Sequence, residues 1–257
     1  MLRYFAAVII AALIFVTLYQ HTTTAGPETQ PGLTKEDVQT IVKEYLLENP
    51  EVVIDSLEAY KEKQVKEADA KAKTTLKEMH AEIYEHPATP KFGNLEDPDV
   101  KIVEFFDYHC GYCKHMLPVI SQLVEEDPGL QIILREFPIP SEDSARASRA
   151  GLAVYALAPD KYFDYHAALM KHKGQYSEKK LLEMAATLGI DKDKLKAEME
   201  KPEIDEEIKR TRKITEGLNL TGTPAFIIGT EILPGAASLD SFKEAIKAAR
   251  EAKKNDQ

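Results

Sequence analysis

The two cysteines of this chain limit its possible folds most, because both lie in one short segment, Cys110-Gly111-Tyr112-Cys113. Residues 100–106, just before it, are apolar on both alternating faces, which is typical of a central strand covered on both sides. Apolar side chains at helical spacing follow up to Glu126, and a second strand-like run covers 130–137. The cysteine pair is therefore predicted to lie between a buried strand and a helix, within a strand–helix–strand unit.

Composition narrows the chemistry of this pair. Two cysteines cannot form a disulfide framework, and a chain of 257 residues buries a core without one, so the cysteines are expected to be reactive. The net charge is −10 and no basic cluster occurs, which argues against binding to nucleic acid or anionic lipid. Motifs of the GxGxxG, GxxxxGK[ST], GxSxG and HExxH types are absent, so nothing supports a nucleotide site, a serine nucleophile or a zinc peptidase.

Residues 1–25 predict an export signal. Met1-Leu2-Arg3 precedes an uncharged apolar run from Tyr4 to Tyr19, and the polar stretch after it ends in Ala25-Gly26. Sixteen apolar residues are intermediate between a cleaved signal core and a short membrane anchor, so both interpretations stay open. In either case the rest of the chain is expected outside the cytoplasm, in a periplasm or another extracytoplasmic space.

Residues 26–60 predict a helical extension, called the arm below. Thr34 and Asp37 have the spacing of a capping box, and Asn49-Pro50 predicts the start of a second helix. Helices this short cannot bury an apolar stripe by themselves. The residues of the stripe are Val38, Ile41, Val42, Tyr45, Leu46, Val53, Leu57 and Tyr60. We therefore expect the arm to self-associate into a homodimer or homotrimer.

The remainder predicts an α/β domain behind a connecting segment. Residues 61–90 are rich in Lys, Glu and Ala and predict a charged helical linker. Residues 91–254 form the expected domain, in which 141–220 is a block of short helices separated by Pro and Gly. Two further strands, 225–228 and 231–233, predict a β-hairpin before a last helix from Leu239.

The sequence resembles the thioredoxin superfamily at three places. They are the Cys110/Cys113 pair at a helix start, Pro118 five residues later, and Thr223-Pro224 before the third strand. With its helical insertion, the segment 95–252 is similar to exported disulfide oxidoreductases of the DsbA type. The resemblance implies a thioredoxin-like fold with an inserted helical domain, preceded by the α-helical extension, and an enzyme that needs no cofactor. It also implies that Thr223-Pro224 is a cis-proline dipeptide that holds the substrate chain.

Three residues are assigned catalytic roles. The helix N-terminus favours the thiolate of Cys110, which makes Cys110 the nucleophile, and Cys113 is the less exposed resolving thiol. Glu104 interrupts an apolar strand six residues before Cys110. The resembled family has a buried acid at this offset that moves the proton of the resolving cysteine. The alternative is a solvated glutamate at a sheet edge. Some relatives pair the acid with a lysine on the next strand, where this chain has Gln131 and Ile132.

The residues around the cysteines suggest a direction for the reaction. Gly111 and Tyr112 are expected to tune the redox poise, and His109 flanks the pair. Gly-Tyr, together with Thr223 before the proline, is similar to the DsbC-type isomerases and to the ScsC proteins associated with copper tolerance. Both kinds oligomerise through an N-terminal extension. The resemblance thus favours an isomerase or reductase that acts on exported cysteine-containing proteins and exchanges electrons with a thiol–disulfide partner in the membrane.

Three alternatives stay open at this point. The enzyme could be a net disulfide oxidase. It could be a copper-binding periplasmic carrier that uses Cys110, Cys113 and one of the flanking histidines, His109 or His115. A third possibility is an anchored surface or scaffold protein whose redox site is secondary.

Overall fold

The computed structural model describes residues 32–139 and 141–255, so the predicted export signal at 1–25 lies outside the described residues. The chain divides into two compact units, one up to Lys63 and one from Gln64 onward. None of the helices within the described ranges combines the length and the hydropathy that crossing a bilayer requires.

The first unit consists of helices, as the sequence predicts. Helix α2 (Lys35–Glu48) begins at the predicted capping box: the Thr34 hydroxyl accepts the Asp37 N–H at 3.1 Å, and Asp37 Oδ2 accepts the Thr34 N–H at 2.9 Å. No residue of α2 is buried. Helix α3 (Glu51–Glu78) starts directly after Pro50 and continues into the second unit. It has no break at residue 60, where we predict that the arm ends and the linker begins.

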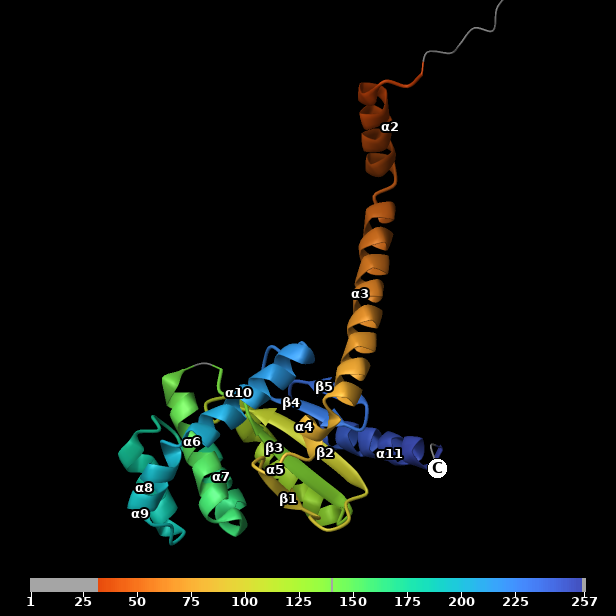
Figure 1. The fold of residues 1–257 in the computed structure, drawn as a ribbon. Helices are drawn as coiled ribbons and strands as arrows, with labels where there is room; N and C mark the ends of the chain where they lie inside the picture. The colour runs from red at the N-terminus through yellow and green to blue at the C-terminus, as the bar shows by residue number, and fades with distance from the viewer. Residues whose placement is uncertain (1–31, 140, 256–257) are drawn as a thin grey trace, which may run out of the picture. The chain divides into compact units, whose positions relative to one another are not determined.

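The second unit is built on a five-stranded sheet of order β1-β3-β2-β4-β5 (Figure 1). Its strands are β1 (Lys91–Gly93), β2 (Val100–Phe106), β3 (Leu130–Glu136), β4 (Ala225–Ile228) and β5 (Glu231–Pro234). Strand β2 runs parallel to β3, whereas the other pairs are antiparallel. The sequence predicts every strand except β1, which has only three residues and is defined by its pairing with β3.

Helix α5 (Gly111–Glu126) connects β2 to β3, which confirms the predicted strand–helix–strand unit. Its apolar side chains pack on one face of the sheet together with α11 (Leu239–Asn255) and part of the helical insertion. The other face is covered by the end of α3, by α4 (His80–Tyr84) and by α10 (Pro202–Gly217). Strand β2 is therefore buried on both faces, as its uninterrupted apolar sequence predicts.

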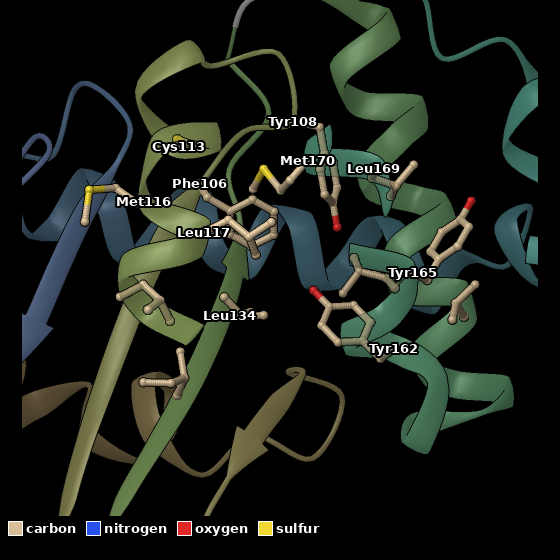
Figure 2. Close-up of a cluster of buried hydrophobic side chains, with 14 of the residues drawn as sticks. Phe106, Tyr108, Cys113, Met116, Leu117, Leu134, Tyr162, Tyr165, Leu169 and Met170 are labelled. Atoms are coloured by element: carbon tan, nitrogen blue, oxygen red, sulfur yellow. The ribbon is translucent and has the colours of Figure 1, made fainter. Parts of the chain in front are cut away.

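The predicted helical block between β3 and β4 is present. It contains α6 (Glu142–Leu157), a 3₁₀ turn η1 (Pro159–Lys161), α7 (Tyr162–Lys171), α8 (Glu178–Thr187), α9 (Lys192–Met199) and α10. Tyr162 and Tyr165 of α7 are buried in the apolar cluster on the first face of the sheet. Figure 2 shows both tyrosines on α7, close to Leu169.

The segment before β1 is packed into the second unit. Leu76, Ile83 and Tyr84 belong to the apolar cluster on the second sheet face. Arg135 of β3 is fully buried there; it pairs with Glu207 of α10 at 2.8 Å and donates to the carbonyl oxygens of Glu82 and Ile83 at the end of α4. The last part of the stretch predicted as a linker, from Leu76 on, thus contributes to the core on this face of the sheet.

Candidate active site

Cys110 lies where the central strand passes into helix α5. Strand β2 ends at Phe106, and the chain then turns, with the Cys110 N–H donating to the Asp107 carbonyl oxygen at 3.1 Å. Cys110 is the N-cap residue of α5, and its Sγ accepts the Cys113 N–H at 3.4 Å. This places the sulfur at the positive end of the helix dipole. Cys110 is half-buried, whereas Cys113, one turn into the helix, is fully buried, and both are free thiols.

The predicted substrate-binding dipeptide lies beside Cys110. The Thr223-Pro224 peptide bond is cis, as expected from the resemblance, and directly precedes β4. The carbonyl oxygen of Thr223 accepts the Cys110 thiol at 3.2 Å. Because β4 is the antiparallel neighbour of β2, residues 113 positions apart in the sequence meet at the cysteine pair.

Glu104 is buried, which excludes the alternative of a solvated glutamate at a sheet edge. It lies in the central strand β2, and burial raises its pKa to about 8. Its register neighbours are Leu134 on β3 and Phe226 on β4, so no charged residue pairs with it across the strands. The sequence predicts Gln131 and Ile132 in this region. This prediction is wrong, because the parallel register pairs Val100 with Leu130 and so brings Leu134 opposite Glu104.

Cys113 and Glu104 influence each other. Burial raises the pKa of the Cys113 thiol far above its usual value, and the negative charge of Glu104 raises it further. A thiol of this kind is protonated at neutral pH and needs a base before it can act as a nucleophile. Glu104, whose pKa is about 8, is a buried carboxyl group whose charge acts on the Cys113 thiol.

Gly111, Tyr112 and His109 are the residues predicted to tune the redox poise. The first two are exposed, and His109 contacts Asp143. Gly111 is exposed, and the Tyr112 side chain is 68% exposed. His109 is half-buried, with its Nε2 atom 2.7 Å from Asp143 Oδ2. Burial acts to raise the pKa of Asp143, but hydrogen bonds from the Tyr176 N–H and from His109 outweigh it and lower that pKa. Asp143 lies in the first turn of α6, and no sequence pattern connects it to His109.

Asp107 is a second polar residue that the sequence analysis missed. It is fully buried in the turn before Cys110. Its Oδ1 atom accepts the His109 N–H at 2.6 Å and the Ser144 hydroxyl at 3.0 Å, and its Oδ2 atom accepts the Ile139 N–H at 3.0 Å. These bonds attach the turn to the start of the helical insertion. The signal in the sequence is an acidic residue at the end of an apolar strand, where an ionised group requires such partners.

In residues 32–139 and 141–255, no group of three or more His, Cys, Asp or Glu side chains is arranged to hold a metal ion. His109, one of the histidines considered for a copper site, is engaged with Asp143.

Comparison with known proteins agrees with this geometry. The model of the DSBA-like thioredoxin domain matches residues 101–247, and the model of the copper resistance protein ScsC N-terminal domain matches residues 35–67. The structure of a thioredoxin-like oxidoreductase from Silicibacter pomeroyi DSS-3 is 34% identical and covers 66% of this chain and 97% of its own, with a TM-score of 0.63.

Two further structures are similar. A linker-deletion mutant of ScsC from Proteus mirabilis is 25% identical and covers 89% of this chain and 100% of its own, with a TM-score of 0.65. A periplasmic thioredoxin-like protein from Salmonella enterica serovar Typhimurium is 26% identical and covers 67% and 96%, with a TM-score of 0.59. The family model spans more than half of the chain and includes both cysteines and the cis-proline. This chain therefore belongs to the family of the DSBA-like thioredoxin domain, as a thiol–disulfide oxidoreductase related to ScsC.

Proposed function

We propose that this protein reshuffles or reduces disulfide bonds in cysteine-containing proteins outside the cytoplasm. The observation that carries the proposal is the placement of Cys110. Its thiol is partly exposed at the N-terminus of α5, 3.2 Å from the Thr223 carbonyl oxygen, while Cys113 is fully buried one turn behind it. The Cys110 thiol can therefore reach a protein substrate, whereas the Cys113 thiol can reach only Cys110.

The first step is attack by the Cys110 thiolate on a substrate disulfide. A Cys110–substrate disulfide forms, the substrate S–S bond breaks, and one substrate sulfur leaves as a thiolate. The Cys113 N–H and the end of the α5 dipole stabilise the negative charge on Cys110 before the attack. The substrate backbone lies along Thr223 and Pro224, which border the sulfur.

The second step has two outcomes. In isomerisation, another thiolate of the substrate attacks the mixed disulfide and releases Cys110 unchanged. In reduction, the ionised form of Glu104 accepts the proton of Cys113, and the Cys113 thiolate attacks the Cys110 sulfur. The mixed disulfide breaks, Cys110 and Cys113 become a disulfide, and the substrate sulfur leaves and takes up a proton, so that the substrate is released with two thiols. Glu104 suits this role for two reasons. Burial raises its pKa to about 8, so its carboxylate is a stronger base than an ordinary one, and its negative charge acts on the Cys113 thiol.

The arm supports isomerisation over net oxidation. All large apolar side chains of α2 are exposed in the single chain, from 37% for Leu46 to 72% for Leu47. The ScsC N-terminal model covers most of the arm, and such a domain suggests oligomerisation. An oligomer places several Cys110 sites near one misfolded chain and hinders reoxidation by a membrane protein. The predicted export signal, and the periplasmic description of the Salmonella protein, support a location outside the cytoplasm.

The test uses the full mature chain in reduced form and a substrate with scrambled disulfides. We expect catalytic amounts to restore the activity of the substrate, and Cys110→Ser to abolish this. Leu95→Ala, at a residue 62% exposed and outside the proposed site, serves as the control and should keep the parent activity. A protein that oxidises reduced substrate but never reshuffles a scrambled one would contradict isomerisation and indicate a net oxidase. The thiol state of Cys110 and Cys113, trapped with acid in the native compartment, gives an independent reading: it is mostly reduced if the proposal is correct.

A further inference from the structure

Beneath the cysteine pair lies a polar cluster that the proposed chemistry does not use. Glu136, the last residue of β3, is 1% exposed and faces the helical insertion. Its Oε1 atom accepts the hydroxyl of Tyr108 at 2.9 Å and that of Tyr162 at 3.3 Å. The Tyr108 hydroxyl is also 3.2 Å from Nδ1 of the buried His166. Figure 2 shows the hydroxyl groups of Tyr108 and Tyr162 pointing toward one another between the sheet and α7.

Tyr108 connects this cluster to the reactive sulfur. It is fully buried and lies two residues before Cys110, in the turn that also contains Asp107. Its backbone carbonyl oxygen accepts the Tyr176 hydroxyl at 2.9 Å, and its hydroxyl group contacts His166 of α7, so the insertion holds the residue at both its backbone and its side chain. We call Glu136, Tyr108, Tyr162, His166 and Tyr176 the tyrosine clamp.

Burial favours the uncharged forms of the titratable groups of the clamp. It raises the pKa of Glu136 well above its usual value and lowers the pKa of His166 to about 3. Glu136 Oε1 thus gives the two buried phenolic hydroxyls a hydrogen-bond acceptor. The fit is close, since a Cβ atom on Gly151 of α6 would lie 2.6 Å from Glu136 Oε1 and 2.8 Å from the Tyr108 hydroxyl oxygen.

We propose that Glu136 is a positioning residue for the redox centre: through Tyr108 it fixes the turn before Cys110 against the helical insertion and so sets the reactivity of the Cys110 sulfur. The Cys110 sulfur has two close polar partners, the Cys113 N–H at 3.4 Å and the Thr223 carbonyl oxygen at 3.2 Å. These belong to α5 and to the segment before β4, whereas Cys110 itself follows the clamped turn. A shift of the turn therefore changes both distances at once.

The proposal rests on the thiol chemistry proposed above, and the experiment measures the thiol directly rather than isomerase turnover. Two quantities are measured at one fixed pH on the reduced full chain: the rate at which Cys110 is alkylated, and the equilibrium of the Cys110/Cys113 pair with glutathione. If the parent protein itself shows no reactive Cys110, the proposed function fails. If the parent is reactive and the variants do not differ from it, only the clamp proposal fails.

Three variants test the clamp. Glu136→Leu removes the acceptor of both hydroxyls, and Gly151→Ala forces the clamp apart without removing a polar group. We expect each to change the alkylation rate and the glutathione equilibrium about threefold or more, since a lost or distorted buried hydrogen bond has effects of this size. Glu136→Gln keeps a neutral acceptor oxygen at the same place and is expected to stay within about twofold of the parent.

The control is Arg135→Met, on the opposite face of the same strand. Arg135 is as deeply buried as Glu136 and has an ion pair with Glu207, but it contacts α4 and α10 rather than the turn. We expect this variant to lower the free energy of unfolding and leave Cys110 reactivity unchanged. The proposal is overturned if Glu136→Leu and Gly151→Ala behave like Arg135→Met. Should Glu136→Leu not fold, Tyr108→Phe, which removes only one hydroxyl, replaces it and must show the same change in Cys110.

Discussion

At the scale of single residues, Cys110 and Cys113 differ in their exposure to solvent. They are only three positions apart, but Cys110 lies at the start of helix α5 and Cys113 lies one turn inside it. Cys110 caps α5 at the surface, and Cys113 points into the apolar cluster under the helix. The N-terminus of helix α5 stabilises a negative charge on the Cys110 sulfur. Burial destabilises a negative charge on the Cys113 sulfur and so raises the pKa of that thiol. The two identical side chains therefore lie in different environments, which is the basis of the different roles proposed for them.

The first prediction follows from this difference. Cys110→Ser is expected to abolish thiol–disulfide exchange, because the remaining Cys113 is buried and protonated near neutral pH. Cys113→Ser is expected to accumulate mixed disulfides with substrate, visible on a non-reducing gel, because no resolving thiol remains. Stoichiometric alkylation of the reduced parent protein should label Cys110. Labelling of Cys113 first would contradict the assignment.

The second prediction concerns Glu104 and pH. Its pKa is about 8 in the folded protein against 4.5 for the ordinary side chain, so the folded state holds an extra proton between these values. Stability attributable to Glu104 is thus present below about pH 4.5 and is lost as the pH rises through about 8. We expect the reduced parent to lose on the order of a few kcal/mol more than Glu104→Gln between pH 5 and pH 9 in urea unfolding.

The comparison with Glu104→Gln isolates this carboxyl group, because every other titrating group is common to both proteins. Equal pH dependence of the two unfolding free energies would show that Glu104 is not buried with a raised pKa. The proton-transfer role proposed for it would then lose its basis.

At the scale of elements, the segment between the arm and the sheet is the least expected part of the fold. Its charged sequence predicts a solvated linker, yet Leu76, Ile83 and Tyr84 cover one face of the sheet. The buried Arg135 binds the end of α4 by its carbonyl oxygens and binds α10 through Glu207. Arg135, one residue before the end of β3, thus joins β3, α4 and α10 in the core.

The third prediction tests this packing. Ile83→Ala is expected to lower the free energy of unfolding by about 2 to 5 kcal/mol, since Ile83 is fully buried. The matched control is Ile54→Ala on α3, where the side chain is 56% exposed, and its effect is expected within about 0.5 kcal/mol. Urea denaturation measures both. A chain that starts at Lys91 should be less stable than one that starts at Gln64, and equal stability would contradict a core role for α4.

At the scale of the whole molecule, the arm carries an apolar surface that the described chain leaves uncovered. Such a surface on a helix with no buried residue is typical of an interface between subunits. The residues of the candidate active site, in contrast, all lie in the second unit: Glu104 is in β2, Cys110 caps α5, and Thr223 lies in the segment before β4. The residues proposed for assembly and the residues proposed for catalysis therefore lie in different parts of the sequence.

The fourth prediction follows. Removal of residues 26–60 is expected to convert a dimer or trimer into a monomer that still exchanges disulfides with a dithiol but no longer isomerises scrambled substrate. Light scattering gives the mass, and the two assays give the activities.

A milder variant of the arm is Leu46→Asp, which places a charge on the stripe. Its matched control is Leu95→Asp, at a side chain 62% exposed in the second unit, which should keep the parent mass. A monomeric parent chain would contradict the assembly and favour a net oxidase.

The sequence by itself determined most of the helices and strands and the position of the cysteine pair. Local patterns were sufficient there: helical spacing places α5 behind Cys110, the Thr34 capping box starts α2, and an apolar run of seven residues predicts the central strand. Only the tertiary structure decided which residues meet across the sheet. It set Leu134 opposite Glu104, brought Asp143 to His109, and placed Glu136 under Tyr108. The reason is that local spacing along the chain governs secondary structure, whereas these contacts depend on strand register and on the position of a helical insertion, which the whole core sets together.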